Sequence, residues 1–321
     1  MRTLFMGTGE IALPSFRMMV ERGGLAGLVT QPDRPVGRSS RLRPPRIKTA
    51  AGDLGVKVVQ PEKIGSKEGL DEVAALEPDL IVVMAYGQIL PRTLLELPRY
   101  GCINVHASLL PRHRGASCIQ AAIAAGDSES GVSIIYMTEE LDAGDIIMKV
   151  AIPLDHEETG ETLHDRLAEL APAVLSESMN CIASGEVSRN PQNESLATYA
   201  RRLHRGDGEL NWAHSSKDLE CRIRAHDPWP GSFTSFHDAR GRVKRLKMFP
   251  GGTVMEEIGN VSPGEIIRVS SSGITVACGT GAMRFHEVQV EGGNRLPVAE
   301  FIKGNLLLAG DCFFSLASPG E

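Results

Sequence analysis

The first half of the chain alternates short apolar runs with stretches whose apolar residues recur at helical spacing. Five runs rich in Val, Ile and Leu predict buried strands, at 3–6, 25–30, 56–60, 80–86 and 102–106. Helical patterns at 13–23 and 70–78 lie between them. Strands that alternate with helices are typical of a mostly parallel sheet covered by helices. We therefore expect an α/β, Rossmann-like domain in this half of the chain.

The pattern changes after this alternation. Two β-rich runs, 131–138 and 145–154, lie close together and suggest an antiparallel pair, and a long amphipathic helix follows over 161–185. The next residues are polar and interrupted by Gly, Pro and Asn, as in a linker. Short strand-like runs separated by turn residues then predict a second, smaller OB-like β-barrel domain. The expected parts are a catalytic domain over 1–188, a linker over 189–206 and a barrel over 207–321.

The composition is that of an ordinary globular chain, since 42% of the 321 residues are hydrophobic and 23% are charged. No apolar run reaches the roughly 18 residues that a membrane-spanning helix needs. The first ten residues lead directly into a strand pattern and do not resemble a secretory signal. We therefore expect a cytoplasmic protein without membrane association. The six cysteines form no Cys-x-x-Cys pair, so neither a zinc site nor a redox motif is indicated.

The charges are unevenly distributed along the chain. The formal net charge of −6 argues against a uniformly basic nucleic-acid-binding protein. The stretch 34–48, however, has no acidic residue and contains six cations, Arg34, Arg38, Arg41, Arg43, Arg46 and Lys48. A charge run of this kind is most often a solvated surface loop. It also suits contacts with the phosphates of a nucleic acid.

A glycine-rich turn, Gly7-Thr8-Gly9, follows the first predicted strand and precedes the first predicted helix. With Ala12 it fits the G-x-G-x-x-G/A pattern of dinucleotide-binding domains. The acidic residue that would hold a ribose at the end of the second strand is missing, because that position reads Thr30-Gln31. We therefore interpret the pattern as a strand–helix turn that requires small residues, in preference to a nicotinamide-nucleotide site.

The strand predicted over 102–106 ends in Asn-x-His. Alternation along a strand places Asn104 and His106 on one face, roughly 7 Å apart, at the carboxyl end where open α/β sheets carry their sites. An amide donor and a protonated imidazole are suited to stabilise a developing oxyanion. Asp142 and Asp145, which lie beside glycine further along, could hold the imidazolium or position a proton-accepting water. Each residue alone is equally well explained by a turn or a structural hydrogen bond, so the residues by themselves indicate only acyl or amine chemistry.

The motifs around these residues resemble a known family. Asn-Val-His-x-Ser-Leu-Leu-Pro-x-x-Arg-Gly, over 104–115, followed by Leu-Asp-x-Gly, over 141–144, is similar to the 10-formyltetrahydrofolate-dependent formyltransferases. The resemblance implies that Asn104, His106 and Asp142 are catalytic, and it selects Asp142 over Asp145. It also implies that 10-formyltetrahydrofolate is the formyl-donating co-substrate and that the reaction needs no metal.

The same resemblance implies where the folate binds. The Ser-Leu-Leu-Pro segment and two further segments would form a flat, partly apolar slot with backbone hydrogen bonds for the pterin. The expected residues are Ser108, Leu109, Leu110, Pro111, Tyr86, Gln88, Ile89, Leu90, Met137 and Glu139. The last six of these are also typical of strand ends and core edges.

The resemblance to the branch of the family that formylates methionyl-tRNA covers nearly the whole chain. It extends to 30–38, 85–91, 160–170 and 223–231. That branch carries a comparable basic loop that grips the acceptor stem, so the cations of 34–48 are expected to contact the methionyl-tRNA acceptor end. No obligate protein partner is indicated. The chain departs from the pattern at Gly9, where proline is usual, and at 291–295, which holds fewer cations.

Four other functions fit parts of the pattern. A sugar-nucleotide N-formyltransferase shares the Asn-x-His and Leu-Asp-x-Gly motifs but would not need the arginine-rich loop. A folate-dependent formyl hydrolase would use water in place of the amine and is expected to carry further domains. A non-catalytic nucleic-acid-binding protein explains only the basic loop and the barrel. A nicotinamide dehydrogenase rests on the glycine-rich turn alone.

Overall fold

The computed structural model describes residues 1–36, 41–256, 259 and 261–316. The chain folds into two units. The first comprises residues 1–118, 129–153 and 164–200, and the second comprises 119–128, 154–163 and 201–321. Residues 190–200, which the sequence places in a linker, lie within the first of these units.

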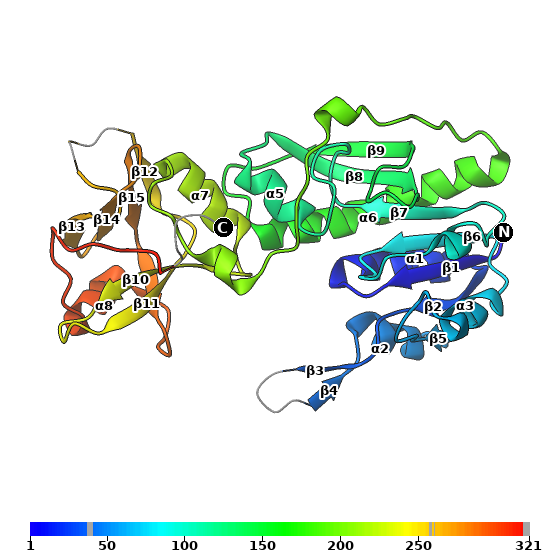
Figure 1. The fold of residues 1–321 in the computed structure, drawn as a ribbon, viewed down its shortest axis with the longest axis horizontal. Coiled ribbons are helices and arrows are strands. Elements are labelled where there is room, and N and C mark those ends of the chain that lie inside the picture. Colours follow the sequence, from blue (N-terminus) through cyan, green and yellow to red (C-terminus); the bar gives the residue numbers. More distant parts are fainter. Residues whose placement is uncertain (37–40, 257–258, 260, 317–321) are drawn as a thin grey trace. The chain divides into compact units, whose positions relative to one another are not determined.

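A seven-stranded sheet forms the centre of the first unit (Figure 1), in the order β5-β2-β1-β6-β7-β8-β9. The first five strands in this order, β5, β2, β1, β6 and β7, pair in parallel. β8 pairs antiparallel with both β7 and β9. The expected mostly parallel sheet and the expected antiparallel pair are therefore confirmed. The strands are β1 (Thr3–Gly7), β2 (Leu25–Val29), β5 (Val58–Val59), β6 (Leu80–Met84), β7 (Cys102–His106), β8 (Glu129–Tyr136) and β9 (Ile146–Pro153).

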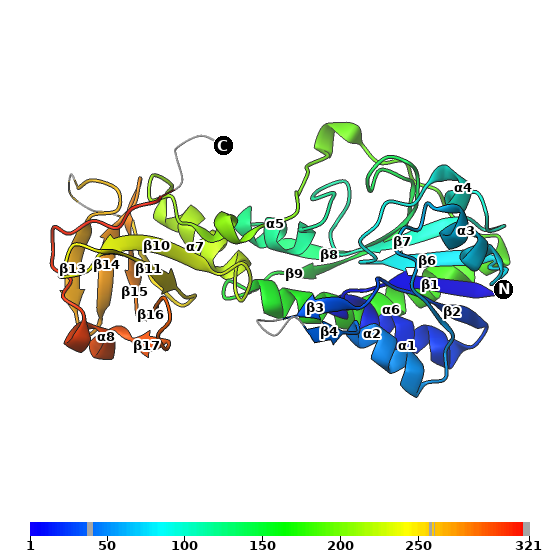
Figure 2. The same ribbon diagram turned by 60° about the horizontal axis from the view of Figure 1, so that its bottom comes forward.

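Helices cover both faces of this sheet (Figure 2), with α1 and α2 on one face and α3 and α4 on the other. Alternation along β1 explains both contacts. Phe5 packs against Phe16 of α1, with ring centroids 5.8 Å apart, while Leu4 and Met6 join the core cluster of the opposite face. The helices are α1 (Leu13–Arg22), α2 (Arg46–Asp53), α3 (Lys67–Ala74), α4 (Arg92–Leu95) and the long α6 (Gly160–Ser184) that the sequence predicts after the sheet.

The basic stretch after β2 forms a hairpin and the start of a helix, where the sequence predicts an open loop. β3 (Arg34–Val36) pairs with the antiparallel β4 (Arg41–Arg43), and α2 begins at Arg46. The side chains of Arg34 and of β4 are exposed. The alternation rule could not find this hairpin, because neither face of an exposed strand pair carries an apolar pattern.

The second unit contains two four-stranded antiparallel sheets, in the orders β10-β11-β16-β17 and β12-β15-β14-β13. Between them lies a core in which the ring of Trp212 meets Phe285 and Phe313. The expected small antiparallel domain is confirmed. Its strands are β10 (Ser232–His237), β11 (Val243–Met248), β12 (Thr253–Met255), β13 (Ile266–Ser270), β14 (Gly273–Ala277), β15 (Ala282–Phe285), β16 (Glu287–Val290) and β17 (Leu296–Pro297).

Three further helices and three short 3-10 turns complete the described chain. The helices α5 and α8 were not predicted from the sequence. The helices are α5 (Cys118–Ala124), α7 (Ser216–Ala225) and α8 (Val298–Gly304), and the 3-10 turns are η1 (Glu10–Ala12), η2 (Glu194–Leu196) and η3 (Arg205–Gly208).

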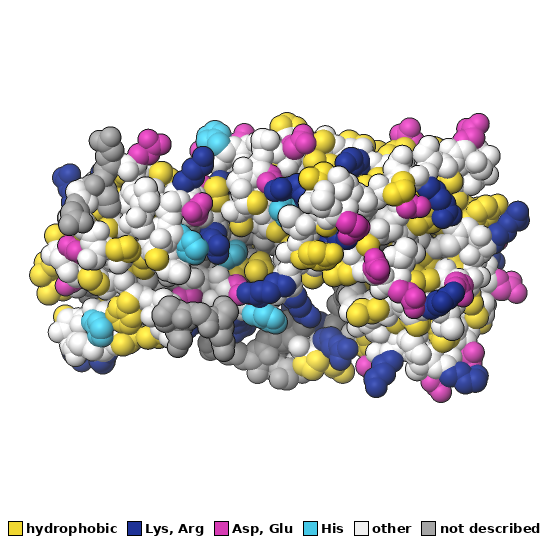
Figure 3. Space-filling model, turned by 45° about the horizontal axis from the view of Figure 1, so that its top comes forward, with side chains coloured by type: hydrophobic (Ala, Val, Ile, Leu, Met, Phe, Trp, Pro, Cys, Tyr) yellow, Lys and Arg dark blue, Asp and Glu magenta, His cyan; other side chains and the backbone are white. Residues whose placement is uncertain are grey.

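The surface carries charges of both signs. Figure 3 shows Lys and Arg side chains interspersed with Asp and Glu over the face in view. Within the described ranges, no helix has the length and apolar character needed to cross a bilayer. The same residues include no group of three or more His, Cys, Asp and Glu side chains that could hold a metal ion.

Candidate active site

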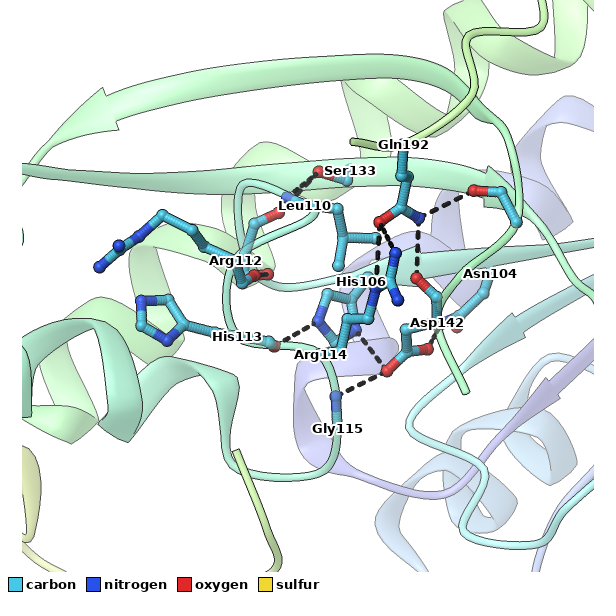
Figure 4. A network of polar contacts seen from close by, with 12 residues as sticks. Asn104, His106, Leu110, Arg112, His113, Arg114, Gly115, Ser133, Asp142 and Gln192 are labelled. Carbon is cyan, nitrogen blue, oxygen red and sulfur yellow. Dashed lines mark hydrogen bonds and ion pairs between the residues drawn. The ribbon is translucent and has the colours of Figure 1, made fainter. Parts of the chain in front are cut away.

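The three residues predicted to be catalytic meet at the carboxyl end of β7 (Figure 4). Asn104 and His106 lie on this strand, and Asp142 lies in the turn between β8 and β9. The Nδ2 atom of Asn104 donates a hydrogen bond to Oδ1 of Asp142 at 3.1 Å. The Nδ1 atom of His106 lies 3.6 Å from Oδ2 of the same carboxylate. One carboxylate thus faces both β7 side chains.

The carboxylate of Asp142 is held by a backbone donor as well. The amide of Gly115 donates to Oδ2 at 2.8 Å. Gly115 has a φ of 108°, and a Cβ atom added there would lie 2.6 Å from the carbonyl oxygen of Ala200, so only glycine fits. Asp142 itself has a φ of 51°, in the left-handed region that few non-glycine residues occupy. A backbone of this kind at a polar site needs surrounding contacts that hold it in place.

His106 is buried, and its two ring nitrogens face different groups. Its Nε2 atom donates to the carbonyl oxygen of His113 at 3.0 Å, while Nδ1 faces Asp142. Burial alone lowers the pKa of His106, but the neighbouring Cys118 sulfur, the Asp142 carboxylate and the His113 carbonyl raise it to about 9. The imidazole is therefore protonated at neutral pH, which gives the site a hydrogen-bond donor with a positive charge.

The Ser-Leu-Leu-Pro segment that follows β7 is anchored by β8. The hydroxyl of Ser133, which pairs in register with His106, accepts from the Leu110 amide at 3.1 Å and donates to the Ser108 carbonyl at 2.7 Å. The hydroxyl of Ser108 in turn donates to the Arg112 carbonyl at 2.8 Å. A cis peptide bond joins Leu110 to Pro111. These contacts fix the turn beside the catalytic residues, and Ser133 is a residue that the sequence reasoning missed.

A groove of about 930 Å³ runs along the other side of the Asp142 turn. Met137 and Glu139 of the expected folate set line it, together with Gly144 and Arg189. The guanidinium of Arg189 lies over the ring of Tyr136, 4.0 Å from its centroid. The side chains of the three catalytic residues are not among the groove lining, so the groove adjoins the catalytic group through the backbone of the turn.

The segment after β6 contributes to the core more than to a surface slot. The side chains of Tyr86 and Leu90 are buried in the core cluster of the sheet face covered by α3 and α4. The side-chain oxygen of Gln88 accepts from the Ile64 amide at 2.8 Å. Ile89, in contrast, is 88% exposed. Of the four expected residues of this segment, Ile89 is thus the one whose side chain is fully available to a ligand.

The residues expected to contact tRNA differ in their surroundings. Arg34, Arg41 and Arg43 lie on the β3–β4 hairpin and are exposed, and Arg34 lies 4.0 Å from Glu62. Two cations on α2 have acidic partners, since Arg46 lies 3.1 Å from Glu10 and Lys48 lies 2.8 Å from Asp33. Arg38 lies outside the described residues.

Two further residues of the network in Figure 4 were not predicted as functional. Arg114 is 1% exposed, and Gln192 donates a hydrogen bond to the Asp142 carbonyl at 2.8 Å. Arg114 belongs to the Arg-Gly end of the motif over 104–115, so the motif could have drawn attention to it. Gln192 lies in a polar stretch without periodicity, where the sequence gives no signal.

Comparison with known proteins identifies the class. Residues 5–179 match the family described as Formyl transferase, and residues 202–306 match Formyl transferase, C-terminal domain. Among solved structures, HypX from Aquifex aeolicus in complex with tetrahydrofolic acid has a TM-score of 0.61 at 18% identity, over 95% of this chain and 48% of that one. The N-formyltransferase from Helicobacter canadensis, in complex with folinic acid and dTDP-3-aminofucose, has a TM-score of 0.62 at 16% identity, over 89% and 99%. At these identities the two structures show a shared fold.

The curated relatives narrow the class further. Methionyl-tRNA formyltransferase from Akkermansia muciniphila is 47% identical over 305 residues, which cover 95% of this chain and 97% of that protein. The chain therefore belongs to the methionyl-tRNA formyltransferases, a branch of the formyl transferase family.

Proposed function

We propose that the chain transfers the formyl group of 10-formyltetrahydrofolate to the α-amino group of methionyl-tRNA. The products are N-formylmethionyl-tRNA and tetrahydrofolate. The observation that carries the proposal is the convergence of Asn104, His106 and Asp142 at the end of β7, in a chain of this family. The cytoplasm, where translation is initiated in bacteria, is the corresponding place of action.

The geometry supports a direct attack by the amine. A free α-amino group has a pKa of about 7.7–8.0, so a useful fraction is neutral near pH 7.5. Its nitrogen attacks the formyl carbon, and a tetrahedral intermediate with an oxyanion results. The Asn104 amide carries two hydrogens, of which one binds Asp142. The other hydrogen donates to the oxyanion, as does the Nδ1–H of His106, which lies 3.6 Å from Oδ2 of Asp142 and so is not held in a hydrogen bond with that carboxylate.

Proton transfer completes the reaction. The attacking nitrogen must lose a proton, and N10 of the folate must gain one as its bond to the formyl carbon breaks. Asp142 is the carboxylate nearest to both β7 side chains, so it accepts the amine proton through a water and returns it toward N10. Its negative charge also holds His106 in the protonated form. The scheme uses no covalent enzyme intermediate.

We place the folate between the anchored turn and the groove. Ser108, Leu109, Leu110 and Pro111 form a fixed turn beside His106, and their carbonyl oxygens, which each accept one hydrogen bond, keep a second lone pair for the ligand. Met137 and Glu139 line the groove on the far side of the Asp142 turn. A flat aromatic ligand needs such a combination of apolar wall and fixed backbone polar groups.

The β3–β4 hairpin suits the acceptor end of the tRNA. The exposed Arg41 and Arg43 present two cations on one short strand, with the 68% exposed Leu42 between them. Arginine side chains of this kind neutralise phosphates and release counterions. We assign Arg34 to the same contact, and Arg46 and Lys48 to the base of the hairpin, where they pair with Glu10 and Asp33.

Replacing Arg41 and Arg43 together with alanine is expected to raise KM for methionyl-tRNA without changing kcat at saturating tRNA. The slope of log kcat/KM against log salt concentration should become shallower by about one for each phosphate that the variant no longer neutralises. Steady-state kinetics at several salt concentrations measure both quantities. Arg17→Ala, which removes an exposed cation from α1 of the same unit, is the control and should leave the slope unchanged. An unaltered slope in the double variant would exclude the hairpin from tRNA binding.

The function itself is tested by mixing the protein with 10-formyltetrahydrofolate and different acceptors. Release of tetrahydrofolate should require methionyl-tRNA and should match the N-formylmethionyl-tRNA formed. Release without any acceptor would identify a hydrolase. Turnover only with an amino-sugar nucleotide would overturn the substrate assignment, and an absence of turnover with every acceptor would favour a binding protein.

A further inference from the structure

The segment 190–200, which we call the strap, crosses both loops of the catalytic group. At one end Asn190 exchanges backbone hydrogen bonds with Ile146, the first residue of β9, at 2.8 and 3.1 Å. At the other end the Arg114 amide donates to the Thr198 carbonyl at 2.8 Å, and the Ala200 amide donates to the Arg114 carbonyl at 2.7 Å. The strap therefore joins the turn that carries Asp142 to the loop that carries Gly115.

Gln192 is the strap residue that contacts the Asp142 turn. Its Nε2 atom donates to the carbonyl oxygens of Asp142 and Gly144, both at 2.8 Å. Its Oε1 atom accepts from Nη2 and Nε of Arg114, at 2.9 and 3.2 Å. Both amide hydrogens and the amide oxygen are thus used. The opposite orientation of the amide would set oxygen against two carbonyls and nitrogen against a cation, so the contacts fix which way it points.

Arg114 fixes the position of the Gln192 side chain by donating hydrogen bonds to its amide oxygen. Its guanidinium is buried and forms two hydrogen bonds with the carboxylate of Glu194, at 2.6 and 2.9 Å. It also donates to the hydroxyl of Tyr199 at 3.2 Å. A buried cation requires such partners. The strap supplies all three partner side chains of Arg114, which are Gln192, Glu194 and Tyr199. The position of Gln192 is therefore set by a rigid, charge-neutralised neighbour.

The hydrogen bonds of Gln192 go to the backbone of the Asp142 turn, which has an uncommon conformation. Asp142 has its φ in the left-handed region, at 51°, and its carboxylate must face Asn104, His106 and the Gly115 amide at once. Gly144 follows two residues later, and its own carbonyl is held by the same amide group. Two hydrogen bonds from one side chain thus clamp the turn on the carboxyl side of the catalytic residue.

We propose that Gln192 is a positioning residue for the formyl-transfer reaction, which holds the Asp142 turn so that the carboxylate faces Asn104 and His106. The proposal rests on the proposed function for its kinetic consequences. Gln192 does not touch the substrates. It acts through the backbone of Asp142, and Arg114 and Glu194 act through Gln192.

Gln192→Met keeps the length of the side chain but removes the donor and the acceptor. We expect kcat/KM to fall about 10- to 100-fold, the loss associated with a displacement of roughly 1 Å at a catalytic group, while KM for both substrates changes little. The titratable groups next to His106 are Asp142 and Cys118. A less well placed Asp142 carboxylate stabilises the imidazolium less, so the alkaline limb of the pH profile should move to lower pH. A purely structural role would lower the thermal stability without moving this limb.

Two further variants keep the test decisive. Gln192→Glu retains a partner for the buried Arg114, so it folds even if the methionine variant does not, yet it cannot donate to the two carbonyls. It should show the same loss in kcat/KM, whereas the shift of the alkaline limb is measured in Gln192→Met, because the new carboxylate would itself raise the pKa of the imidazolium. Asn193→Ala is the matched control on the same strap, because the Asn193 side chain accepts only from Ser195 within η2. It should keep the wild-type rate and profile.

The imidazole titration of His106, followed by NMR in the absence of substrates, separates this inference from the proposed function. A downward shift of the His106 titration in Gln192→Met, which adds no charge, supports positioning even if methionyl-tRNA proves not to be the acceptor. A wild-type titration in Gln192→Met, or a wild-type kcat/KM in Gln192→Glu, would overturn the inference, whichever acceptor is used.

Discussion

Asp142→Asn is expected to lower kcat/KM by about 10²–10⁴-fold, the range typical of a lost general acid–base group. The substitution keeps the size of the side chain but removes the negative charge that faces His106. It therefore removes both the proton acceptor and the support for the imidazolium. Steady-state kinetics with methionyl-tRNA over a range of pH values measure both effects.

The pH dependence of kcat/KM shows in which direction the pKa of His106 changes when the support for the imidazolium is lost. In the wild type, kcat/KM should rise as the α-amino group loses its proton near pH 8, and fall as His106 loses its own near pH 9. A nearby negative charge raises the pKa of an imidazole by stabilising its charged form. Without that charge, His106 loses its proton at lower pH, so the alkaline limb should move toward neutrality.

Asp71→Asn serves as the control for this prediction. It removes one carboxylate from an exposed ion pair with Lys67 on α3 of the same unit and should leave both limbs in place. If Asp142→Asn retained the wild-type alkaline limb, the charge of Asp142 would have no part in the protonation of His106. A loss in rate without such a shift would restrict Asp142 to proton relay.

His106→Ala and Asn104→Ala are each expected to lower kcat by about 10²–10³-fold, as when one oxyanion donor is lost. KM should change less, because both side chains act on the charge that develops after the amine attacks. Single-turnover measurements of formyl transfer report the chemical step directly. The exposed His156 provides the matched control, and His156→Ala should keep the wild-type rate.

The double variant tests whether the two donors act on one group. If Asn104 and His106 bind the same oxyanion, their combined loss should be smaller than the product of the single losses, since residues that act as a unit are not additive. Near-full activity in His106→Ala would remove His106 from the mechanism. Multiplicative losses would place the two side chains on different groups.

The shared position of Asn104 and His106 was predictable because it depends only on the geometry of a single strand. A two-residue spacing on an apolar strand puts Asn104 and His106 on one face, and the end of a strand in an open α/β sheet is exposed to ligands. The choice of Asp142 over Asp145 needed the family resemblance, because both are acidic residues in one glycine-containing turn. The structure directs the Asp142 carboxylate toward β7, while the Asp145 carbonyl accepts from the Tyr136 amide.

The strap could not be predicted in the same way. Its sequence, Asn190 to Ala200, is polar and has no apolar period, and such a stretch is usually a linker. Here the polar side chains are used as hydrogen-bond partners of two loops that are distant in sequence. Tyr86 and Leu90 illustrate the converse, because apolar residues next to a ligand-binding motif can belong to the core and contribute to the site only through their backbone.

The strap follows the sheet in the sequence, so it is synthesised after the strands whose catalytic turn it supports. The chain emerges from the ribosome from its N-terminus, and domains generally begin to fold as they emerge. β1 to β9 and α6 are complete by Ser184, yet the partners of the buried Arg114 and the clamp on Asp142 arrive only with residues 190–200. A nascent or truncated chain that stops at residue 188 lacks the strap that supports the catalytic turn, so a catalytic fragment must extend at least to Ala200.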